Sequence, residues 1–296
     1  MNNGIWNAIG AYLVWGLLPI YWKALQVVPA GQILSHRVVW SFMFLMGIIL
    51  ARKDWSAFRR AISSGRMVLI YTLAACLLAV NWLTYIWGVN AGYIVETSLG
   101  YFINPLVSVL LGVIFLRERL RPFQWLPIGM AAIAVVYLTL SVGSLPWIAL
   151  VLALSFGLYG LLKKVAPLGS LHGLGLETGI LVVPCLVYLG WAELQGIGAF
   201  GHVNVTEHSL LVFTGIVTAM PLLFFANAAR SINLSTLGVL QYMAPTMQFL
   251  IGVLLYNEPF TPARVVGFGL IWIALAIYTT EGLIVRRRAE ISTAAK

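Results

Sequence analysis

Ten stretches of about 17 to 24 residues in this chain are almost wholly apolar, and short polar segments separate them. A helix needs about 20 apolar residues to cross the hydrocarbon core of a bilayer. The connections are short, and the longest of them, 194–208, leaves no room for a soluble domain. We therefore predict ten membrane-spanning helices, at about 4–22, 33–51, 67–88, 93–116, 123–141, 146–162, 175–193, 209–229, 235–256 and 265–283.

The composition also indicates a membrane protein. Of the 296 residues, 61% are hydrophobic and 9% are charged, and the mean hydropathy is +0.94. A water-soluble protein of this length could not cover so much apolar surface. The sequence contains neither GxxxxGK[ST] nor HExxH nor GxSxG. We therefore expect no enzyme and no cofactor or metal, since these patterns mark nucleotide hydrolysis, zinc sites and serine hydrolases.

The formal net charge of +9 is distributed unevenly between the two ends of the helices. With ten spans, fifteen Lys and Arg residues fall on the side of both termini, whereas the other side holds only Lys23 and Arg264. Arg37 lies within a span. Cytoplasmic loops of membrane proteins carry this excess of positive charge. We therefore expect a multi-pass protein of a bacterial inner membrane with both termini in the cytoplasm, and no binding of nucleic acid.

The second half of the chain repeats the first, and the numbers of matching positions differ by 140 or 141. The matches that apolar composition explains least are Pro105 with Pro245, Gly112 with Gly252, Glu118 with Glu258, Pro122 with Pro262, Gly16 with Gly157 and Lys23 with Lys164. Each copy holds five spans, and five is odd, so the second copy enters the membrane from the opposite side. Such inverted repeats are common in secondary transporters. The predicted organisation is 1–143 and 144–285 as two repeats and 286–296 as a basic cytoplasmic tail.

Both repeats carry a proline within a predicted span. Pro105 is near the centre of 93–116, and Pro245 is near the centre of 235–256. Proline frees the carbonyl four residues earlier, here that of Tyr101 or Gln241. In a membrane this carbonyl is tolerated where protein or a watery cavity covers it. Spans four and nine are therefore expected to line a polar cavity; a kink that serves packing is the alternative.

The blocks NPLVSVLLGVIFLRERL and APTMQFLIGVLLYNEPF, with a Pro, a central Gly and a terminal Glu, resemble the EamA repeat of the drug/metabolite transporter superfamily. The opening block AYLVWGLLPIYWKALQVVPAGQILSHRVVWS resembles the RarD-like branch of that family. The resemblance covers nearly the whole chain. It implies ten helices around a central cavity, the fifth and tenth at the periphery, and export of small metabolites or drugs.

Aromatic and amide side chains deep in the spans are candidates for the substrate cavity, because small-molecule sites combine apolar walls with a few polar groups. The candidates are Trp15, Asn81, Trp82, Tyr85, Tyr101, Asn104, Pro105, Tyr159, Gln241, Pro245 and Gln248. Together they suggest an amphipathic, aromatic or amino-acid-like small molecule.

Ionisable side chains within spans are costly and usually functional. The first repeat places Lys23, His36, Arg37 and Glu96 toward the outer side, where we expect Glu96 to pair with Arg37 or Lys23. The second repeat places Lys164, Glu177 and Arg230 toward the cytoplasm. These groups suggest an outer and an inner charged gate. The alternative is that they extend to the interface as long side chains often do.

Glu118 and Glu258 each close an apolar span. A carboxylate at a helix C-terminus opposes the helix dipole, so each needs a cationic neighbour. We expect Arg121 or Arg117 beside Glu118, and Arg264 beside Glu258, with a structural role for both carboxylates.

The function that these patterns favour is a secondary transporter that exports small organic solutes by alternating access. Its expected partners are a small-molecule substrate and the bilayer, with protons as a candidate coupling ion through Glu96 or His36. The competing hypothesis is a flippase or membrane enzyme acting on a lipid-linked substrate, which would need a lateral opening and a basic headgroup pocket.

Overall fold

The computed structural model describes residues 3–62, 65–117, 122–231 and 240–294. These residues are helical apart from short connections. The first part of the chain forms α1 (Asn3–Ala24), α2 (Ala30–Ala51), α3 (Trp55–Ile62), α4 (Gly65–Asn90), α5 (Ile94–Leu116) and α6 (Pro122–Val142). The second part forms α7 (Trp147–Val165), α8 (Ser170–Leu194), α9 (Val205–Ser231), α11 (Met243–Leu250), the π-helix η1 (Ile251–Leu255) and α12 (Pro262–Ala294).

Nine of the ten predicted spans correspond to α1, α2, α4 to α9 and α12. Among the described residues, eight helices are long and apolar enough to cross a membrane. The apolar parts of α7 and of 243–255 are shorter. The all-helical membrane fold expected from the apolar pattern is therefore confirmed.

The ninth predicted span differs from the expectation. Its residues 235–239 lie outside the described part of the chain. Gln241 and Tyr242 form a turn, α11 begins at Met243, and the helix ends in the π-turns of η1. Pro245 therefore lies in the first turn of a helix, where its missing N–H would have no helical partner anyway. The predicted release of the Gln241 carbonyl by a mid-helix proline is wrong, whereas Pro105 does lie inside α5.

The short helix α3 was not predicted. It joins α2 to α4 and carries an apolar side formed by Trp55 and Phe58. Phe58 is buried against Ile49 and Tyr71, whereas Trp55 is exposed. An amphipathic helix of this kind is suited to the membrane surface, where one side meets water and the other meets apolar groups.

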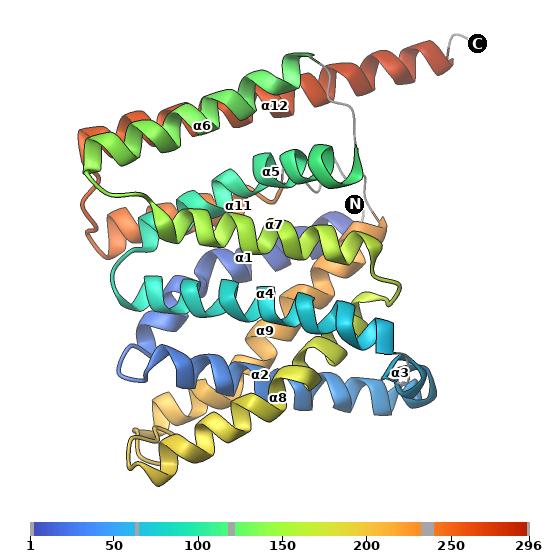
Figure 1. Ribbon diagram of the computed structural model, residues 1–296, viewed down its shortest axis with the longest axis vertical. Coiled ribbons are helices and arrows are strands. Elements are labelled where there is room, and N and C mark those ends of the chain that lie inside the picture. The colour runs from blue at the N-terminus through green and yellow to red at the C-terminus, as the bar shows by residue number, and fades with distance from the viewer. Residues whose placement is uncertain (1–2, 63–64, 118–121, 232–239, 295–296) are drawn as a thin grey trace.

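Most of the long helices run in similar directions, α8 and α9 cross them obliquely, and α3 lies at one end of the bundle (Figure 1). The start of α1 and the end of α12 lie at this same end, and the connections 25–29, 91–93 and 195–204 lie at the opposite end (Figure 1). The basic residues Arg52, Lys53, Arg59 and Arg66 are at the end that holds both termini. This arrangement agrees with an even number of crossings.

Helices α6 and α12 pack against each other along one edge of the molecule, at the top of Figure 1. Helices α2 and α8 pack against each other toward the opposite edge. Between these pairs lie α1, α4, α5, α7, α9 and α11 (Figure 1). The fifth and tenth predicted spans, α6 and α12, are therefore peripheral as the family resemblance implied.

Candidate functional site

The side chain of Arg37 is the most deeply buried cation that the structure describes. It extends from α2, two turns from the start of that helix, and is 4% exposed. Its Nε donates a hydrogen bond to Thr218 Oγ1 on α9 at 2.8 Å. The guanidinium carbon lies 3.9 Å from the centre of the Trp82 ring and 5.2 Å from that of Trp22. At these distances the electron-rich ring faces stabilise the positive charge.

No carboxylate in the described ranges lies within ion-pair distance of Arg37, and its Nη1 is buried without a hydrogen-bond partner there. Tyr21, Tyr85 and Tyr101 are close enough to interact with the guanidinium electrostatically. The hydroxyl of Tyr85 and the indole N–H of Trp22 are also buried without described partners. Arg37 is thus surrounded by aromatic rings and unused polar atoms, not by a counter-ion.

Asn81 joins this region to α7. Its Nδ2 donates to the carbonyl of Leu152 and to Ser155 Oγ, both at 3.1 Å, and its Oδ1 accepts from the Tyr101 hydroxyl at 3.3 Å. The Tyr101 ring meets Tyr85 edge to face at 5.5 Å between centres. We call the set Trp22, Arg37, Asn81, Trp82, Tyr85 and Tyr101 the Arg37 cluster.

The other predicted cavity residues lie apart from this cluster to different degrees. Gln248 Nε2 donates to the carbonyl of Trp15 at 2.9 Å, which links α11 to α1, and Gln248 Oε1 is buried without a described partner. Asn104 accepts a hydrogen bond from Ser108 one turn along α5. Gln241 lies in the turn before α11, and Pro245 lies in the first turn of that helix. Tyr159 belongs to a second cluster.

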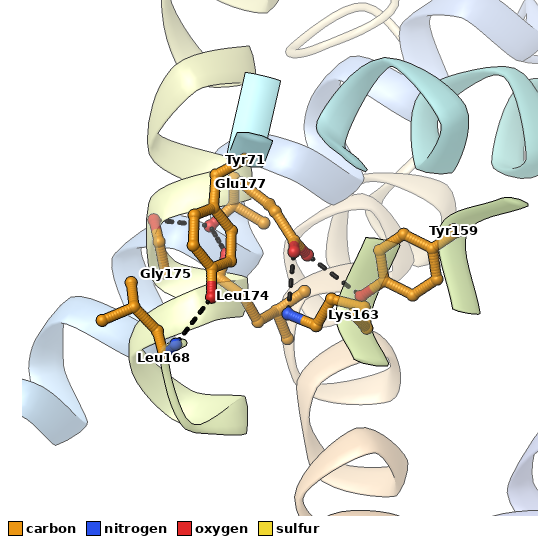
Figure 2. Close-up of polar contacts among 8 residues, drawn as sticks. Tyr71, Tyr159, Lys163, Leu168, Leu174, Gly175 and Glu177 are labelled. Atoms are coloured by element: carbon orange, nitrogen blue, oxygen red, sulfur yellow. Dashed lines mark hydrogen bonds and ion pairs between the residues drawn. The ribbon is translucent and has the colours of Figure 1, made fainter. Parts of the chain in front are cut away.

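That second cluster surrounds Glu177 on α8, whose side chain is fully buried (Figure 2). Its Oε1 lies 2.8 Å from Lys163 Nζ, and its Oε2 accepts a hydrogen bond from the Tyr159 hydroxyl at 3.0 Å. Lys163 Nζ also lies 5.1 Å from the centre of the Tyr71 ring. The Tyr71 hydroxyl accepts a hydrogen bond from the Leu168 N–H at 2.9 Å. We call Tyr71, Tyr159, Lys163 and Glu177 the Glu177 cluster; it ties together α4, α7 and α8.

The sequence pattern selected Lys164 for this position, but the cation that meets Glu177 is Lys163. Consecutive residues point about 100° apart on a helix, and packing sets the rotation of the helix. The sequence alone therefore does not say which residue of α7 meets Glu177. The side chains of Lys164 and Arg230 lie outside the described part of the structure.

The predicted pairing of Glu96 with Arg37 or Lys23 is wrong. Glu96 Oε1 accepts a hydrogen bond from the backbone N–H of Ile148 at 3.2 Å, in the first turn of α7. The first N–H groups of a helix lack internal partners and favour a nearby negative charge. Lys23 instead donates to the carbonyl of Asn90 at 3.1 Å and lies 5.6 Å from the Tyr256 ring centre.

Glu258, in the connection 256–261, accepts hydrogen bonds from the start of α5, as Glu96 does from the start of α7. Its two carboxylate oxygens accept from the N–H groups of Ile94 and Val95 at 2.7 and 2.8 Å. Burial raises the pKa of Glu258, and these two hydrogen bonds counter part of that rise. The expected partner Arg264 donates to the carbonyl of Pro259 at 2.6 Å and forms no direct ion pair with Glu258. Its positive charge, like that of Lys23, is nevertheless close enough to favour the charged form of Glu258. Glu118 lies outside the described residues.

His36, next to Arg37 in the chain, faces a different space. Its ring stacks on Phe200 at 4.9 Å, and its Nε2 is buried without a partner among the described residues. It lines a largely apolar cavity of about 360 Å³ between α2, α8 and the connection before α9, together with Gln32, Trp40, Leu186, Leu189 and Phe200.

Sequence reasoning missed Thr218, Ser155, Tyr71 and Lys163. A lone Thr or Ser in an apolar run carries no periodic signal, and its role depends on which helix lies opposite. The one available signal was the buried Arg37, because an arginine in a span requires partners on neighbouring helices.

A bundle of long apolar helices with buried polar clusters between them is typical of a polytopic membrane protein. Residues 2–140 match the model of the EamA-like transporter family. The chain is 46% identical to a Streptomyces exfoliatus protein named RarD, over 97% of this chain and 91% of that protein. It is 42% identical to the Bacillus subtilis uncharacterized transporter YojE, over 94% of both. The protein belongs to the EamA-like transporter family, within its RarD-like branch.

The fold is also similar to that of a solved crystal structure, with a TM-score of 0.60 over 94% of this chain and 98% of the other. The two chains are 19% identical, so the likeness concerns the fold alone.

Proposed function

We propose that this protein is a secondary transporter that exports small organic metabolites or drugs across the bacterial inner membrane by alternating access. Family membership supports the transporter class, and the relatives named above include one called a transporter. The direction, the solute class and the mechanism are the parts that this proposal adds.

The observation that carries the proposal is a pair of close contacts related by the repeat. Gly16 on α1 lies against Met247 on α11, so that a Cβ at Gly16 would be 2.8 Å from the Met247 sulfur. Gly157 on α7 lies against Val107 on α5, where a Cβ would be 3.0 Å from a Val107 methyl. Gly157 is the counterpart of Gly16 in the second repeat, and Met247 is the counterpart of Val107. The same contact therefore occurs in both halves, with the partners exchanged.

The helix pairs follow the same exchange. Under the proposed division, α1, α2, α4, α5 and α6 correspond to α7, α8, α9, α11 and α12. The contact of α1 with α9 then corresponds to that of α4 with α7, and the contact of α2 with α9 to that of α4 with α8. The pairs α2 with α8, α5 with α11 and α6 with α12 map onto themselves. This pattern supports two inverted repeats at 1–143 and 144–285.

Inverted repeats offer a physical route to alternating access. Two halves of similar structure and opposite orientation can exchange conformations, which produces two states of similar energy that open to opposite sides. The Glu177 cluster lies near the end of the bundle that holds the basic residues, which we assign to the cytoplasm. It is therefore our candidate for the inner gate. The contacts that its side chains make between α4, α7 and α8 would break when that side opens.

Two experiments test the proposal. Counterflow of labelled small solutes into proteoliposomes should be observed with the protein and not with empty vesicles. Cysteines at Gly201 and at Ser292 should react with impermeant maleimide from opposite sides of the membrane, with Ser292 accessible from the cytoplasm. Absence of counterflow for every solute would overturn the proposed function. Labelling of both cysteines from the same side would overturn the proposed topology.

A further inference from the structure

Arg37 is a charge in a costly position. A cation within a membrane span is retained when it pairs with another group or serves a solute or ion pathway. Among the described residues Arg37 has a hydroxyl partner, Thr218, and two aromatic neighbours, Trp22 and Trp82, but no anion. Cation–π contacts offset part of the desolvation cost, and they leave the net charge in place.

Glu96, which was expected to neutralise Arg37, is engaged elsewhere, and so are Glu177 and Glu258. Glu96 accepts from the Ile148 N–H, and Glu258 accepts from the N–H groups of Ile94 and Val95. Glu177 is paired with Lys163. The second repeat supplies no compensating charge at the equivalent place, because the residue that corresponds to Arg37 there is Thr178.

The geometry around Arg37 leaves one nitrogen of the guanidinium without a hydrogen-bond partner among the described residues. Its Nε is used by Thr218, and the Trp82 ring lies against the group at 3.9 Å. Nη1 remains without a partner, and so do the Tyr85 hydroxyl and the Trp22 indole N–H on neighbouring side chains. These are all hydrogen-bond donors. An anion with two oxygens matches such a set, since a guanidinium recognises a carboxylate through paired N–H groups.

We propose that Arg37 binds the carboxylate of the transported solute, and that the aromatic members of the Arg37 cluster hold its apolar or aromatic part. The solute class is thus small organic acids with an aromatic or apolar body. This inference rests on the proposed transport function. The cluster lies on α1, α2, α4 and α5, and Arg37 and Asn81 form hydrogen bonds with residues of α9 and α7 from the second half of the chain. Binding of the carboxylate would neutralise Arg37 and give its Nη1 an acceptor.

Matched pairs of compounds that differ only in charge test this assignment. Purified protein in detergent is heated with indole-3-acetate or benzoate, and in parallel with indole-3-acetamide or benzamide. A ligand that binds the folded state raises the unfolding temperature. We expect at least one acid to raise it and its amide to have no effect. The same acid should then show counterflow in proteoliposomes.

Three variants connect the effect to Arg37. Arg37→Gln should abolish the preference for acid over amide. Thr218→Val keeps the side-chain shape, releases the Nε contact, and should weaken binding of the acid by roughly 10-fold, which corresponds to loss of one hydrogen bond to a charged group. Arg52→Gln removes an exposed arginine at the end of α2 and should change nothing. Because Thr218→Val keeps Arg37, it also serves if Arg37→Gln does not fold.

The outcomes separate the two proposals. Equal effects of acid and amide, or an acid preference that survives Arg37→Gln, would overturn the carboxylate site while leaving transport intact. Stabilisation by chloride or inorganic phosphate that the acids do not exceed would also overturn it, since the site would then serve inorganic anions. An Arg37-dependent acid effect without counterflow of any solute would keep the site and overturn the transport function.

Discussion

Gly16 and Met247 approach so closely that no side chain fits between them. A Cβ at Gly16 would lie 2.8 Å from the Met247 sulfur and 2.9 Å from its Cβ. The second of these atoms is fixed to the backbone of α11, so the contact cannot relax by rotation of the methionine. The absence of a side chain at Gly16 therefore allows α1 and α11 to lie at this short distance from each other.

Gly16→Ala should destabilise the protein by about 1–3 kcal/mol, the usual cost of overpacking. Gly157→Ala should cost less, because it meets the mobile ends of Val107 and Leu111. Gly129→Ala is the matched control; nothing lies within 4 Å of its Cβ position, and alanine is the better helix former there. Thermal unfolding in detergent measures all three. Equal unfolding temperatures for Gly16→Ala and Gly129→Ala would contradict the close contact.

The two prolines should now behave differently. Pro105 interrupts the hydrogen bonding of α5, so Pro105→Ala restores a bond to the Tyr101 carbonyl and straightens the helix. We expect equal or greater thermal stability and reduced counterflow, because an irregular point beside the Arg37 cluster is lost. Pro245→Ala lies in the first turn of α11 and should change stability by less than about 1 kcal/mol. Unchanged counterflow with Pro105→Ala would assign this proline to packing.

The Glu177 cluster should respond asymmetrically to loss of either charge. Lys163→Met leaves Glu177 fully buried without a counter-ion and should destabilise the protein by about 3 kcal/mol. Glu177→Gln should cost less, since the Lys163 side chain is 23% exposed and keeps its contacts with Tyr71 and Tyr159. The double variant should recover part of the loss. Lys53→Met, at an exposed lysine, controls for the change in net charge. A fully additive double-mutant cycle would show that the pair is not coupled.

Glu258 offers a test by pH. Burial raises its pKa above the ordinary value of 4.5. A carboxyl whose pKa is higher in the folded state binds its proton more readily there, so its contribution to stability is present below pH 4.5 and is lost as the pH rises through the raised folded-state value. Glu258→Gln, which stays neutral, should remove this part of the pH dependence. Unfolding midpoints of parent and variant between pH 4 and 8, roughly spanning the ordinary and raised carboxyl pKa, make the comparison. Parallel curves would show that Glu258 does not titrate in this range.

Much of the architecture follows from the order of residues alone. Apolar runs long enough to span a bilayer determine most of the helices, because a backbone in lipid must satisfy its own hydrogen bonds. The recurrence of Pro105, Gly112 and Glu118 as Pro245, Gly252 and Glu258 indicated the repeat, and the uneven placement of Lys and Arg indicated that both termini share one side. Each of these features depends on neighbours in sequence or on sums along the chain. None of them requires knowledge of which helices touch.

The partners of individual polar groups were decided only by the tertiary structure. Glu96 and Arg37 have opposite charges and were expected to pair, yet Glu96 meets the start of α7 and Arg37 meets Trp82. The cation that reaches Glu177 is Lys163, which sequence reasoning did not select. The reason is geometric: a residue turns about 100° from its neighbour along a helix, so small changes in helix rotation exchange one partner for another. Rotation is set by packing of apolar side chains from distant parts of the chain, and charge and hydropathy along the sequence do not encode it one residue at a time.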